Sequence, residues 1–390
     1  MWINRSITGK VRKTADSRPA ILLTGARQTG KTSLLKREFP DAEYITFDHI
    51  IHISAAKEAT EYFIRQFNAQ IILDEIQYVP EIFHELKVQI DNDREHYGKW
   101  ILTGSQQFEL MQHISESLAG RISIMHLETL SAAELRLSQI KGYRNHLWKG
   151  GYPEIWSNPE LDLSDFFESY IRTYIERDLK EIIDVKNLND FRRFIRVLAS
   201  RAGQLLNYKN ISADTGISDV TVKKWIHALQ VGGIIYLLPP YYANIGKRMI
   251  KAPKLYFRDH GLLCHFLGIE NEIDWSDHIH KGNLWENFVM MELLKNNNLI
   301  PGQNFFFYRD QNGVEIDFII EKQRVLYFIE AKVGENIDKR KLNFNKVLPL
   351  FSKKSKTEAI LAQNIKENTV IQLNGFNCYN PLLTSLNYKI

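Results

Sequence analysis

The 390-residue chain has very few cysteines. Its only two, Cys264 and Cys378, lie 114 positions apart, and no CxxC pair or Cys/His finger spacing occurs. Such a sequence argues against a disulfide scaffold and against a structural zinc site, and it fits a reducing compartment.

Long apolar runs are also missing. The first residues, MWINRSITGKVRKT, lack the apolar stretch of a signal peptide. No window holds the roughly 18 uninterrupted apolar residues that span a bilayer. We therefore expect a cytoplasmic protein without a membrane partner.

An excess of charge of one sign is absent too. Lys and Arg number 50 and Asp and Glu number 46, so the net charge is only +4. This balance argues against a uniformly basic surface but leaves room for a local basic patch. What the chain does have, 44% apolar and 25% charged residues, is typical of a folded globular protein. Its length predicts two or three domains.

A nucleotide-binding motif stands near the start of the chain. The apolar run at 20–24 is typical of a buried parallel strand. It leads into the segment GARQTGKT at 25–32, which matches G-x-x-x-x-G-K-S/T, and a helical pattern, SLLKREF, follows. Backbone N–H groups of such a loop, together with the helix N-terminus, bind phosphate oxygens. We expect Lys31 to reach the β- and γ-phosphates of ATP and Thr32 to hold Mg²⁺. The expected ATP- or ADP-binding residues of the loop are Gly25, Arg27, Gln28, Thr29, Gly30, Lys31, Thr32 and Ser33.

Two acidic residues end a later strand. Strands are predicted at 44–47 and 70–73, and the second of them ends in Asp74-Glu75. An apolar run closed by acids is the Walker B pattern, in which Asp74 supports Mg²⁺ through water and Glu75 orients or deprotonates the attacking water. An ordinary strand end with solvated acids is the alternative, and the P-loop earlier in the chain argues against it.

Polar residues follow the next predicted strand, at 99–103. Because ligands bind at the carboxyl ends of parallel strands, Ser105 or Gln106 could contact the γ-phosphate. A turn that caps the next helix is an equal alternative. Arg121, in the segment SLAGRI, is either an arginine finger, from the same chain or from a neighbouring copy, or a surface arginine.

The segments GARQTGKT, ILDEIQ, LTGSQQ and SLAGRI together resemble the prokaryotic AAA-type ATPases that pair a P-loop domain with a C-terminal domain of unknown function. The segments at 150–154 and 174–179 also resemble that family, and the similarity covers nearly the whole chain. The resemblance implies an ATPase core. It also implies that residues within 131–200 form a helical lid, in which Arg172 and Arg177 are either phosphate contacts or solvated arginines.

The segment 207–260 has the pattern of a winged helix-turn-helix. A short helix containing ISADTG precedes a turn at 216–219, and the candidate recognition helix covers 220–230. Two strands, IIYLL and KLYFRD, follow it. The candidate helix is expected to bury Val222, Trp225, Ile226 and Leu229 and to present Lys223, Lys224 and His227 to a DNA major groove.

Positive charge is concentrated in the same part of the chain. Between Phe191 and His260, Lys and Arg number 12 against three Asp, a net charge of +9, so the rest of the chain carries about −5. This asymmetry is the electrostatic pattern expected for binding to a phosphate backbone. Internal packing or docking to a protein partner is an equal alternative to DNA binding.

The last third carries an ordered set of acids. Glu286 lies on a predicted helix that begins near 282, a strand at 305–309 and a turn at 310–313 follow, and strands at 314–320 and 325–329 come next. Asp317 lies on the first of these two strands, and Glu330-Ala331-Lys332 ends the second. Period-2 alternation places Glu330 and Lys332 on one face.

Helix, strand and strand with these acids resemble the PD-(D/E)xK nuclease fold. The resemblance implies that Glu286, Asp317 and Glu330 bind Mg²⁺ or Mn²⁺. It also implies that Lys332 activates a metal-polarised water or stabilises developing charge. A solvated sheet edge with acid–base pairs, or a nuclease-like domain that only binds, are the alternatives.

We therefore predict an α/β protein with four segments. They are a P-loop AAA-type core with a parallel sheet (1–140), a helical lid (141–205), a winged helix (206–265) and a restriction-endonuclease-like α/β domain (266–390). The predicted function is Mg²⁺-dependent ATP hydrolysis coupled to DNA binding. Whether the last domain also cleaves DNA with a metal ion is left open by the sequence. The alternative is a nucleotide-controlled protein-interaction switch without cleavage. A homo-oligomer, in which Arg121 acts in trans, also stays open.

Overall fold

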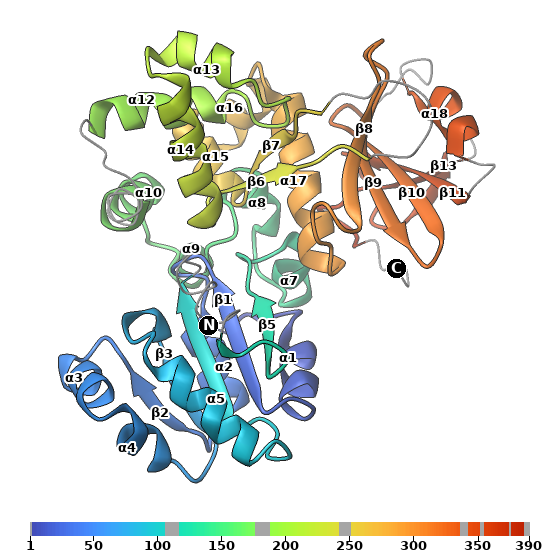
Figure 1. The fold of residues 1–390 in the computed structure, drawn as a ribbon. Helices are drawn as coiled ribbons and strands as arrows, with labels where there is room; N and C mark the ends of the chain where they lie inside the picture. Colours follow the sequence, from blue (N-terminus) through green and yellow to red (C-terminus); the bar gives the residue numbers. More distant parts are fainter. Residues whose placement is uncertain are drawn as a thin grey trace. The chain divides into compact units, whose positions relative to one another are not determined.

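The computed structural model describes residues 2–105, 117–175, 188–241, 251–335, 342–351, 355–373 and 376–385, and Figure 1 shows its fold. The chain divides into two compact units. The first comprises residues 1–129 and 231–233, and the second comprises residues 130–230 and 234–390. The segments predicted as lid, winged helix and last domain thus lie, apart from 231–233, in one unit.

A parallel sheet forms the centre of the first unit. Its order is β2-β3-β4-β1-β5, and every neighbouring pair is parallel. The strands are β1 (Ala20–Gly25), β2 (Glu43–Thr46), β3 (Ile71–Asp74), β4 (Trp100–Ser105) and β5 (Ile122–His126). The strands expected at 20–24, 44–47, 70–73 and 99–103 are confirmed to within two residues, whereas β5 was not predicted.

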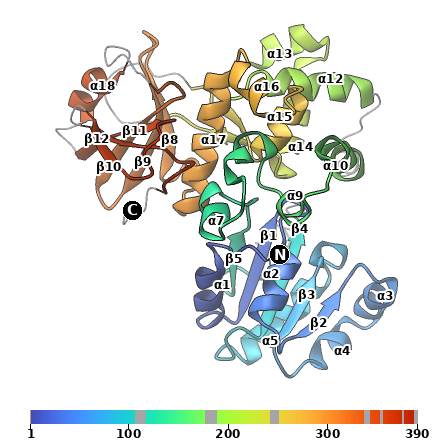
Figure 2. The same cartoon turned by 180° about the vertical axis from the view of Figure 1, so that it is seen from behind.

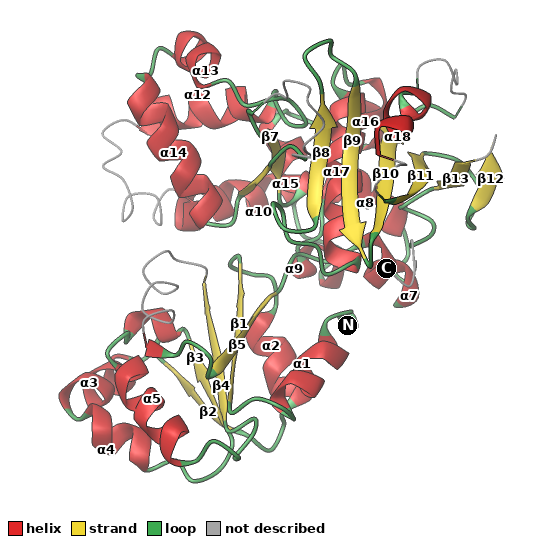
Figure 3. Cartoon of the chain, turned by 45° about the vertical axis from the view of Figure 1, so that its right-hand side comes forward, coloured by secondary structure: helices red, strands yellow, loops and turns green. Residues whose placement is uncertain are grey.

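Helices cover both faces of this sheet, as Figure 3 shows. They are α1 (Thr8–Ala15), α2 (Lys31–Glu38), α3 (Ile50–Glu58), α4 (Thr60–Arg65), the short turn η1 (Ile76–Tyr78) and α5 (Ile82–Asn92). One set of strand side chains, including Leu23 and Ile72, packs on α1 and α2. The alternate set, including Leu22 and Leu73, packs on α4 and α5. Burial on both faces explains why the inner strands β1, β3 and β4 are largely apolar.

The second unit begins with helices. Their order is α7 (Ala132–Leu137), η2 (Tyr143–Asn145), α8 (His146–Lys149), α9 (Pro153–Ser157), α10 (Leu163–Tyr170), a π-helical turn (Ile171–Ile175), α12 (Leu188–Ala199), α13 (Tyr208–Thr215) and α14 (Asp219–Val231). In the predicted lid, Arg172 pairs with Glu168 at 3.6 Å. Arg177 and, in the first unit, Gln106 lie outside the described residues.

Two short strands and three helices follow α14. The strands, β6 (Ile235–Leu238) and β7 (Lys254–Phe257), pair antiparallel, and Leu205 adds an isolated bridge to Lys254. The helices are α15 (His260–Phe266), α16 (Glu272–Asp277) and α17 (Lys281–Asn296). The four positions expected to be buried on α14 are buried, with Val222 and Leu229 fully enclosed, and Lys223, Lys224 and His227 are exposed.

A mixed sheet of order β12-β13-β11-β10-β9-β8 completes the second unit. Its elements are β8 (Phe305–Arg309), β9 (Glu315–Lys322), β10 (Val325–Lys332), α18 (Phe344–Phe351), β11 (Lys356–Gln363), β12 (Ile371–Leu373) and β13 (Phe376–Tyr379). The β8–β9 hairpin turns at the expected residues, where the Asp310 amide donates to the Val314 carbonyl.

One continuous core joins the helices of the second unit to this sheet. Side chains of α14, α15 and α17 pack in the same apolar cluster as Phe318 of β9 and Ile329 of β10. Helix α17 lies between α14 and the sheet in both Figure 1 and Figure 2. The opposite face of the sheet packs on α18. Glu286 of α17 is thereby held beside the acids of β9 and β10.

Candidate functional site

A tightly curled loop joins β1 to α2 in the first unit. Gly25, Gln28 and Gly30 all have positive φ angles, of 153°, 61° and 89°. A Cβ atom on Gly25 would lie 2.3 Å from the carbonyl oxygen of Leu127, so no other residue fits there without moving backbone. This close packing fixes the path of the loop at the carboxyl edge of the sheet.

Lys31, the first residue of α2, is buried within this loop. Its ammonium donates to the carbonyl oxygens of Gly25 (3.2 Å) and Ala26 (2.9 Å). Burial lowers its pKa from the ordinary value, and the carboxylates of Glu75 and Asp74 oppose that shift. A desolvated cation folded back on its own loop gains from an anionic partner.

The other predicted loop residues differ in their burial. Thr29 is buried, and its hydroxyl donates to the carbonyl oxygen of Ala26 at 3.0 Å. Arg27 is half-buried, whereas Gln28 and Ser33 are exposed.

The Asp74 carboxylate, at the end of β3, accepts four hydrogen bonds. One carboxylate oxygen accepts from the hydroxyls of Thr32 and Tyr44, each at 2.8 Å. The other accepts from the Thr103 hydroxyl at 3.0 Å and from the Glu75 amide at 3.1 Å. The structure thus brings together Thr32 and Asp74, the two residues that the sequence assigned to Mg²⁺, while Tyr44 and Thr103 are contacts that the sequence did not suggest.

Glu75 follows with an unusual backbone. Its φ and ψ angles are 55° and 45°, a left-handed conformation that is uncommon for residues other than glycine. Its side chain accepts a hydrogen bond from the amide of Gln77. Backbone outliers of this kind concentrate at functional sites.

Ser105 lies at the same edge, because β4 separates β1 from β3 and Ser105 pairs with Gly25 in register. Its hydroxyl oxygen is buried and has no hydrogen-bond partner within the described part of the chain. A buried hydroxyl without a partner is costly unless a ligand or water satisfies it.

Arg5 is a residue of this site that the sequence analysis missed. It is buried, and its guanidinium donates to the carbonyl oxygen of Thr29 at 2.8 Å and to that of Glu128 at 2.5 Å. It thereby ties the P-loop backbone to the segment after β5. No motif marks an arginine 20 residues before the loop, so only the fold identifies it.

Arg121 lies at the opposite edge of the sheet. It precedes β5, whose Ile122 pairs with Ala20 at the start of β1, whereas the P-loop follows the end of β1. Its guanidinium binds both carboxylate oxygens of Asp91, at 2.8 and 2.7 Å. Hydrogen bonds from Arg121 and Arg94 lower the pKa of Asp91. The structure therefore does not bring Arg121 to the carboxyl edge of the sheet, where the P-loop of its own unit lies.

The residues at the carboxyl edge fit a magnesium nucleotide. The loop has the close backbone packing and left-handed positions of a phosphate cradle. Lys31 supplies a cation, Thr32 and Asp74 supply the hydroxyl and carboxylate that a Mg²⁺ ion requires, and Ser105 offers an unsatisfied hydroxyl.

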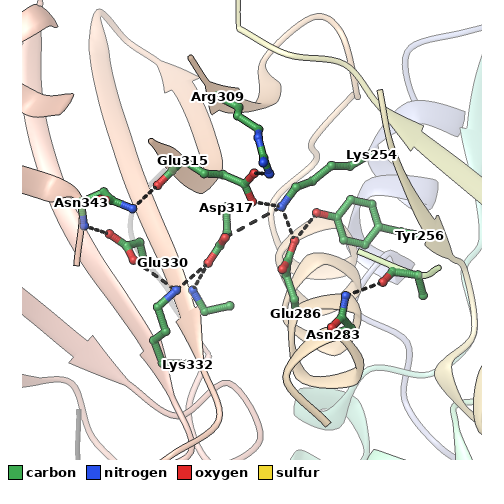
Figure 4. Close-up of polar contacts among 12 residues, drawn as sticks. Lys254, Tyr256, Asn283, Glu286, Arg309, Glu315, Asp317, Glu330, Lys332 and Asn343 are labelled. Atoms are coloured by element: carbon green, nitrogen blue, oxygen red, sulfur yellow. Dashed lines mark hydrogen bonds and ion pairs between the residues drawn. The ribbon is translucent and has the colours of Figure 1, made fainter. Parts of the chain in front are cut away.

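A second polar cluster lies in the second unit, and Figure 4 shows it. The structure brings the predicted acids together there. Lys332 contacts Asp317 at 3.3 Å and Glu330 at 3.1 Å. Asp317 also accepts from the Ala331 amide at 2.8 Å, and Glu330 accepts from the Asn343 amide at 2.6 Å. Glu286 faces the cluster from α17.

Lys254 of β7 also enters this cluster, which the sequence analysis did not foresee. Its ammonium lies 2.8 Å from Glu286, 2.5 Å from Glu315 and 3.9 Å from Asp317. Burial alone would lower the pKa of Lys254, but the three carboxylates raise it above the ordinary value, so the side chain stays charged. The hydroxyl of Tyr256 donates to the same Glu286 oxygen at 2.6 Å.

The predicted metal site does not fit this arrangement. The oxygens of Glu286 and Asp317 that would bind Mg²⁺ or Mn²⁺ face the Lys254 ammonium, and Lys332 covers Glu330. Across the described ranges, no group of three or more His, Cys, Asp and Glu side chains is placed to hold a metal ion. The structure therefore gives no support to Glu286, Asp317 and Glu330 as metal ligands, because Lys254 faces Glu286 and Asp317 and Lys332 faces Glu330.

No helix in the described ranges combines the length and the apolar character needed to cross a membrane.

Three family descriptions match successive parts of the chain. An AAA domain matches residues 17–136, a domain of unknown function (DUF8612) matches residues 140–273, and another domain of unknown function (DUF4143) matches residues 281–374.

Among the solved structures that the chain matches is the Walker-type ATPase PABY2304 of Pyrococcus abyssi. It is 17% identical, with a TM-score of 0.41 over 69% of this chain and 96% of that one. The RuvB Holliday junction branch migration motor of Thermotoga maritima is 14% identical, with a TM-score of 0.32 over 61% of this chain and 90% of its own.

Two mycobacterial relatives match over most of the chain. They are the uncharacterized protein Rv2008c of Mycobacterium tuberculosis and the uncharacterized protein Mb2031c of Mycobacterium bovis. Each is 30% identical over 331 residues, which is 84% of this chain and 73% of the relative. The chain therefore belongs to the same family as these two proteins, and its residues 17–136 carry the AAA domain of the P-loop ATPases.

Proposed function

We propose that the chain binds ATP with Mg²⁺ at the carboxyl edge of the β1–β5 sheet and hydrolyses it. The observation that carries this proposal is the convergence of Lys31, the Thr32–Asp74 pair and Glu75 at one sheet edge. Two chain segments, the start of α2 and the end of β3, supply these groups, and their combination is what phosphoryl transfer to water requires.

Each residue has a distinct role in this proposal. Lys31 leaves the carbonyl oxygens of Gly25 and Ala26 and donates to the phosphate oxygens. Asp74 orients the Thr32 hydroxyl through their 2.8 Å hydrogen bond. Glu75 accepts a proton from the attacking water or orients it. Mg²⁺, when bound, neutralises charge on the phosphate oxygens.

Arg121 serves only in trans in this proposal. Its position at the amino edge keeps it from the P-loop of its own unit, so an arginine finger would have to come from a second copy. To act in this way, the Arg121 guanidinium would first have to break its two hydrogen bonds to Asp91.

Phosphate release by the full chain tests the proposed reaction. We expect turnover that saturates with Mg²⁺ and stops when the ion is chelated, because Thr32 and Asp74 act through it. Turnover that persists unchanged after chelation would contradict the assignment of these two residues.

We further propose that α12, α13, α14 and the β6–β7 pair form a winged helix that binds DNA. Three helices and a small antiparallel sheet, with its bridge to Leu205, are the elements of that fold. Helix α14 exposes Lys223, Lys224 and His227, and the surrounding segment carries a net charge of +9. Exposed cations of a recognition helix neutralise phosphates and reach base edges.

Charge reversal on α14 tests this binding. Lys223→Glu with Lys224→Glu should weaken DNA binding and reduce the slope of log K against log salt by about 0.9 for each DNA phosphate that is no longer neutralised. The matched control is Lys10→Glu with Lys13→Glu, an equal charge change on exposed lysines of α1. If both double variants keep the wild-type salt slope, α14 does not bind DNA and the winged helix docks on protein.

A second candidate function is a nucleotide-controlled protein switch whose last domain has a nuclease-like fold without cleavage. The observation that favours it is the neutralisation of the carboxylate cluster by Lys254. DNA cleavage with Mg²⁺ or Mn²⁺ that disappears in Asp317→Ala would instead restore the nuclease interpretation of Glu286, Asp317, Glu330 and Lys332.

A further inference from the structure

The ammonium of Lys254 lies where the carboxylates of α17 and β9 converge. Three carboxylate oxygens, from Glu286, Glu315 and Asp317, lie within 3.9 Å of its nitrogen. We infer that Lys254 is a built-in cation that takes the place of a divalent metal ion, and that its removal converts the cluster into a divalent-cation site. The inference goes beyond ATP hydrolysis and does not depend on it.

Lys254 is not a surface lysine that happens to reach the cluster. It is only 2% exposed, and its backbone pairs with Leu238 of β6 and with Leu205. A fully buried ammonium without carboxylate partners would strongly destabilise the fold. Its position in the core therefore depends on the acids that surround it.

Helix α17 holds β7 in place beside the cluster. The side-chain amide of Asn287 accepts from the Phe257 amide at 2.8 Å and donates to the Phe257 carbonyl at 3.0 Å. Asn283 donates to the carbonyl oxygen of Ala202 at 2.9 Å, and Tyr256 donates to Glu286 at 2.6 Å. These contacts, drawn in part in Figure 4, keep the lysine on the acids.

Charge balance explains why a dication has no place beside Lys254. Four carboxylates gather there, and each contacts at least one cationic side chain. Glu286 contacts Lys254, Glu315 contacts Lys254 and Arg309, Asp317 contacts Lys254 and Lys332, and Glu330 contacts Lys332. An added divalent ion would meet like charge at close range in a poorly solvated site, which is strongly unfavourable.

Removal of Lys254 leaves the right donors for a metal. Carboxylate oxygens are the hard ligands that Mg²⁺ and Mn²⁺ prefer, and those of Glu286, Glu315 and Asp317 lie within 3.9 Å of the Lys254 nitrogen, so small side-chain movements would bring them onto an ion at that place. Their uncompensated charge would then favour a dication. An ordinary structural ion pair makes a different prediction, since its loss would only destabilise the fold.

The test measures Mn²⁺ binding to the full chain without nucleotide, and electron paramagnetic resonance detects the bound ion. Wild type should show no Mn²⁺ binding that depends on Asp317. Lys254→Ala should gain one site per chain with a Kd at or below about 10⁻⁴ M, the range of weaker oxygen-ligand sites. The added site should disappear in Lys254→Ala/Asp317→Asn, and Mn²⁺ should raise the Tm of Lys254→Ala.

The matched control is Lys356→Ala, because Lys356 lies on the same sheet with a side chain 71% exposed. It should bind Mn²⁺ like wild type. Lys254→Met keeps the length of the side chain and replaces Lys254→Ala if the latter does not fold. A folded Lys254 variant without an added site overturns the inference. So does wild-type protein whose Mn²⁺ binding is reduced by Asp317→Asn, a comparison that needs no Lys254 variant.

Discussion

Lys31→Ala is expected to reduce ATP affinity by about 30-fold to about 4,000-fold, because loss of a buried charge partner costs about 2–5 kcal/mol. The lysine is the only charged side chain of the P-loop that is buried among the loop carbonyls. Its neutral replacement removes the cation that faces the phosphates. Isothermal titration calorimetry with ATP and Mg²⁺ measures the change.

Lys36→Ala is the matched control for this variant. Lys36 lies on the same helix α2 but is exposed, with its ammonium 3.4 Å from the centre of the Tyr44 ring. It should leave ATP affinity near the wild-type value. If Lys31→Ala binds ATP as tightly as Lys36→Ala does, the P-loop assignment is wrong.

Glu75→Gln is expected to leave ATP binding intact and to lower turnover by about 10²- to 10⁴-fold, the usual contribution of a general base. The substitution preserves the shape of the side chain, so the contact with Gln77 and the left-handed backbone at residue 75 can persist. What it removes is the carboxylate that accepts a proton from water. Phosphate release and ATP titration on the same sample separate the two effects.

Glu81→Gln makes the same chemical change at an exposed carboxylate just before α5. Its turnover should match wild type. A Glu75→Gln protein that hydrolyses ATP at the wild-type rate would show that another group activates the water. Loss of ATP affinity in that variant would instead assign Glu75 to binding.

The candidate ATP site at the carboxyl edge of the β1–β5 sheet could be predicted because its sequence motifs are short and local. The P-loop is eight consecutive residues, and the acids that end β3 follow directly from an apolar run. Parallel strands place their carboxyl ends at one edge, so the convergence of Lys31, Asp74 and Ser105 follows from the strand order. Tyr44 and Thr103 were missed because a hydroxyl inside a predicted strand carries no signal of its partner.

The position of Arg121 could not be predicted because β5 was not. The segment at 122–126, ISIMH, is only partly buried and lies at the edge of the sheet, so it lacks the continuous apolar run of the inner strands. Without that strand, the register that places Arg121 at the amino edge is unknown. Its binding to Asp91 is a consequence of that register.

Lys254 was missed for a different physical reason. It lies in a basic segment, where lysines are expected at the surface, and its partners Glu286 and Asp317 are distant in sequence. One signal was available: alternation along KLYF places Lys254 and Tyr256 on the same side of the strand. Both side chains contact the same oxygen of Glu286.

The sequence predicts that ATP hydrolysis by the first unit is coupled to DNA binding by the second. Steady-state ATP turnover with and without duplex DNA, with Glu75→Gln as the control, tests this coupling. We expect turnover that rises several-fold with DNA and vanishes in the control. Turnover that depends on Glu75 but is indifferent to DNA would refute the coupling and would favour the protein switch.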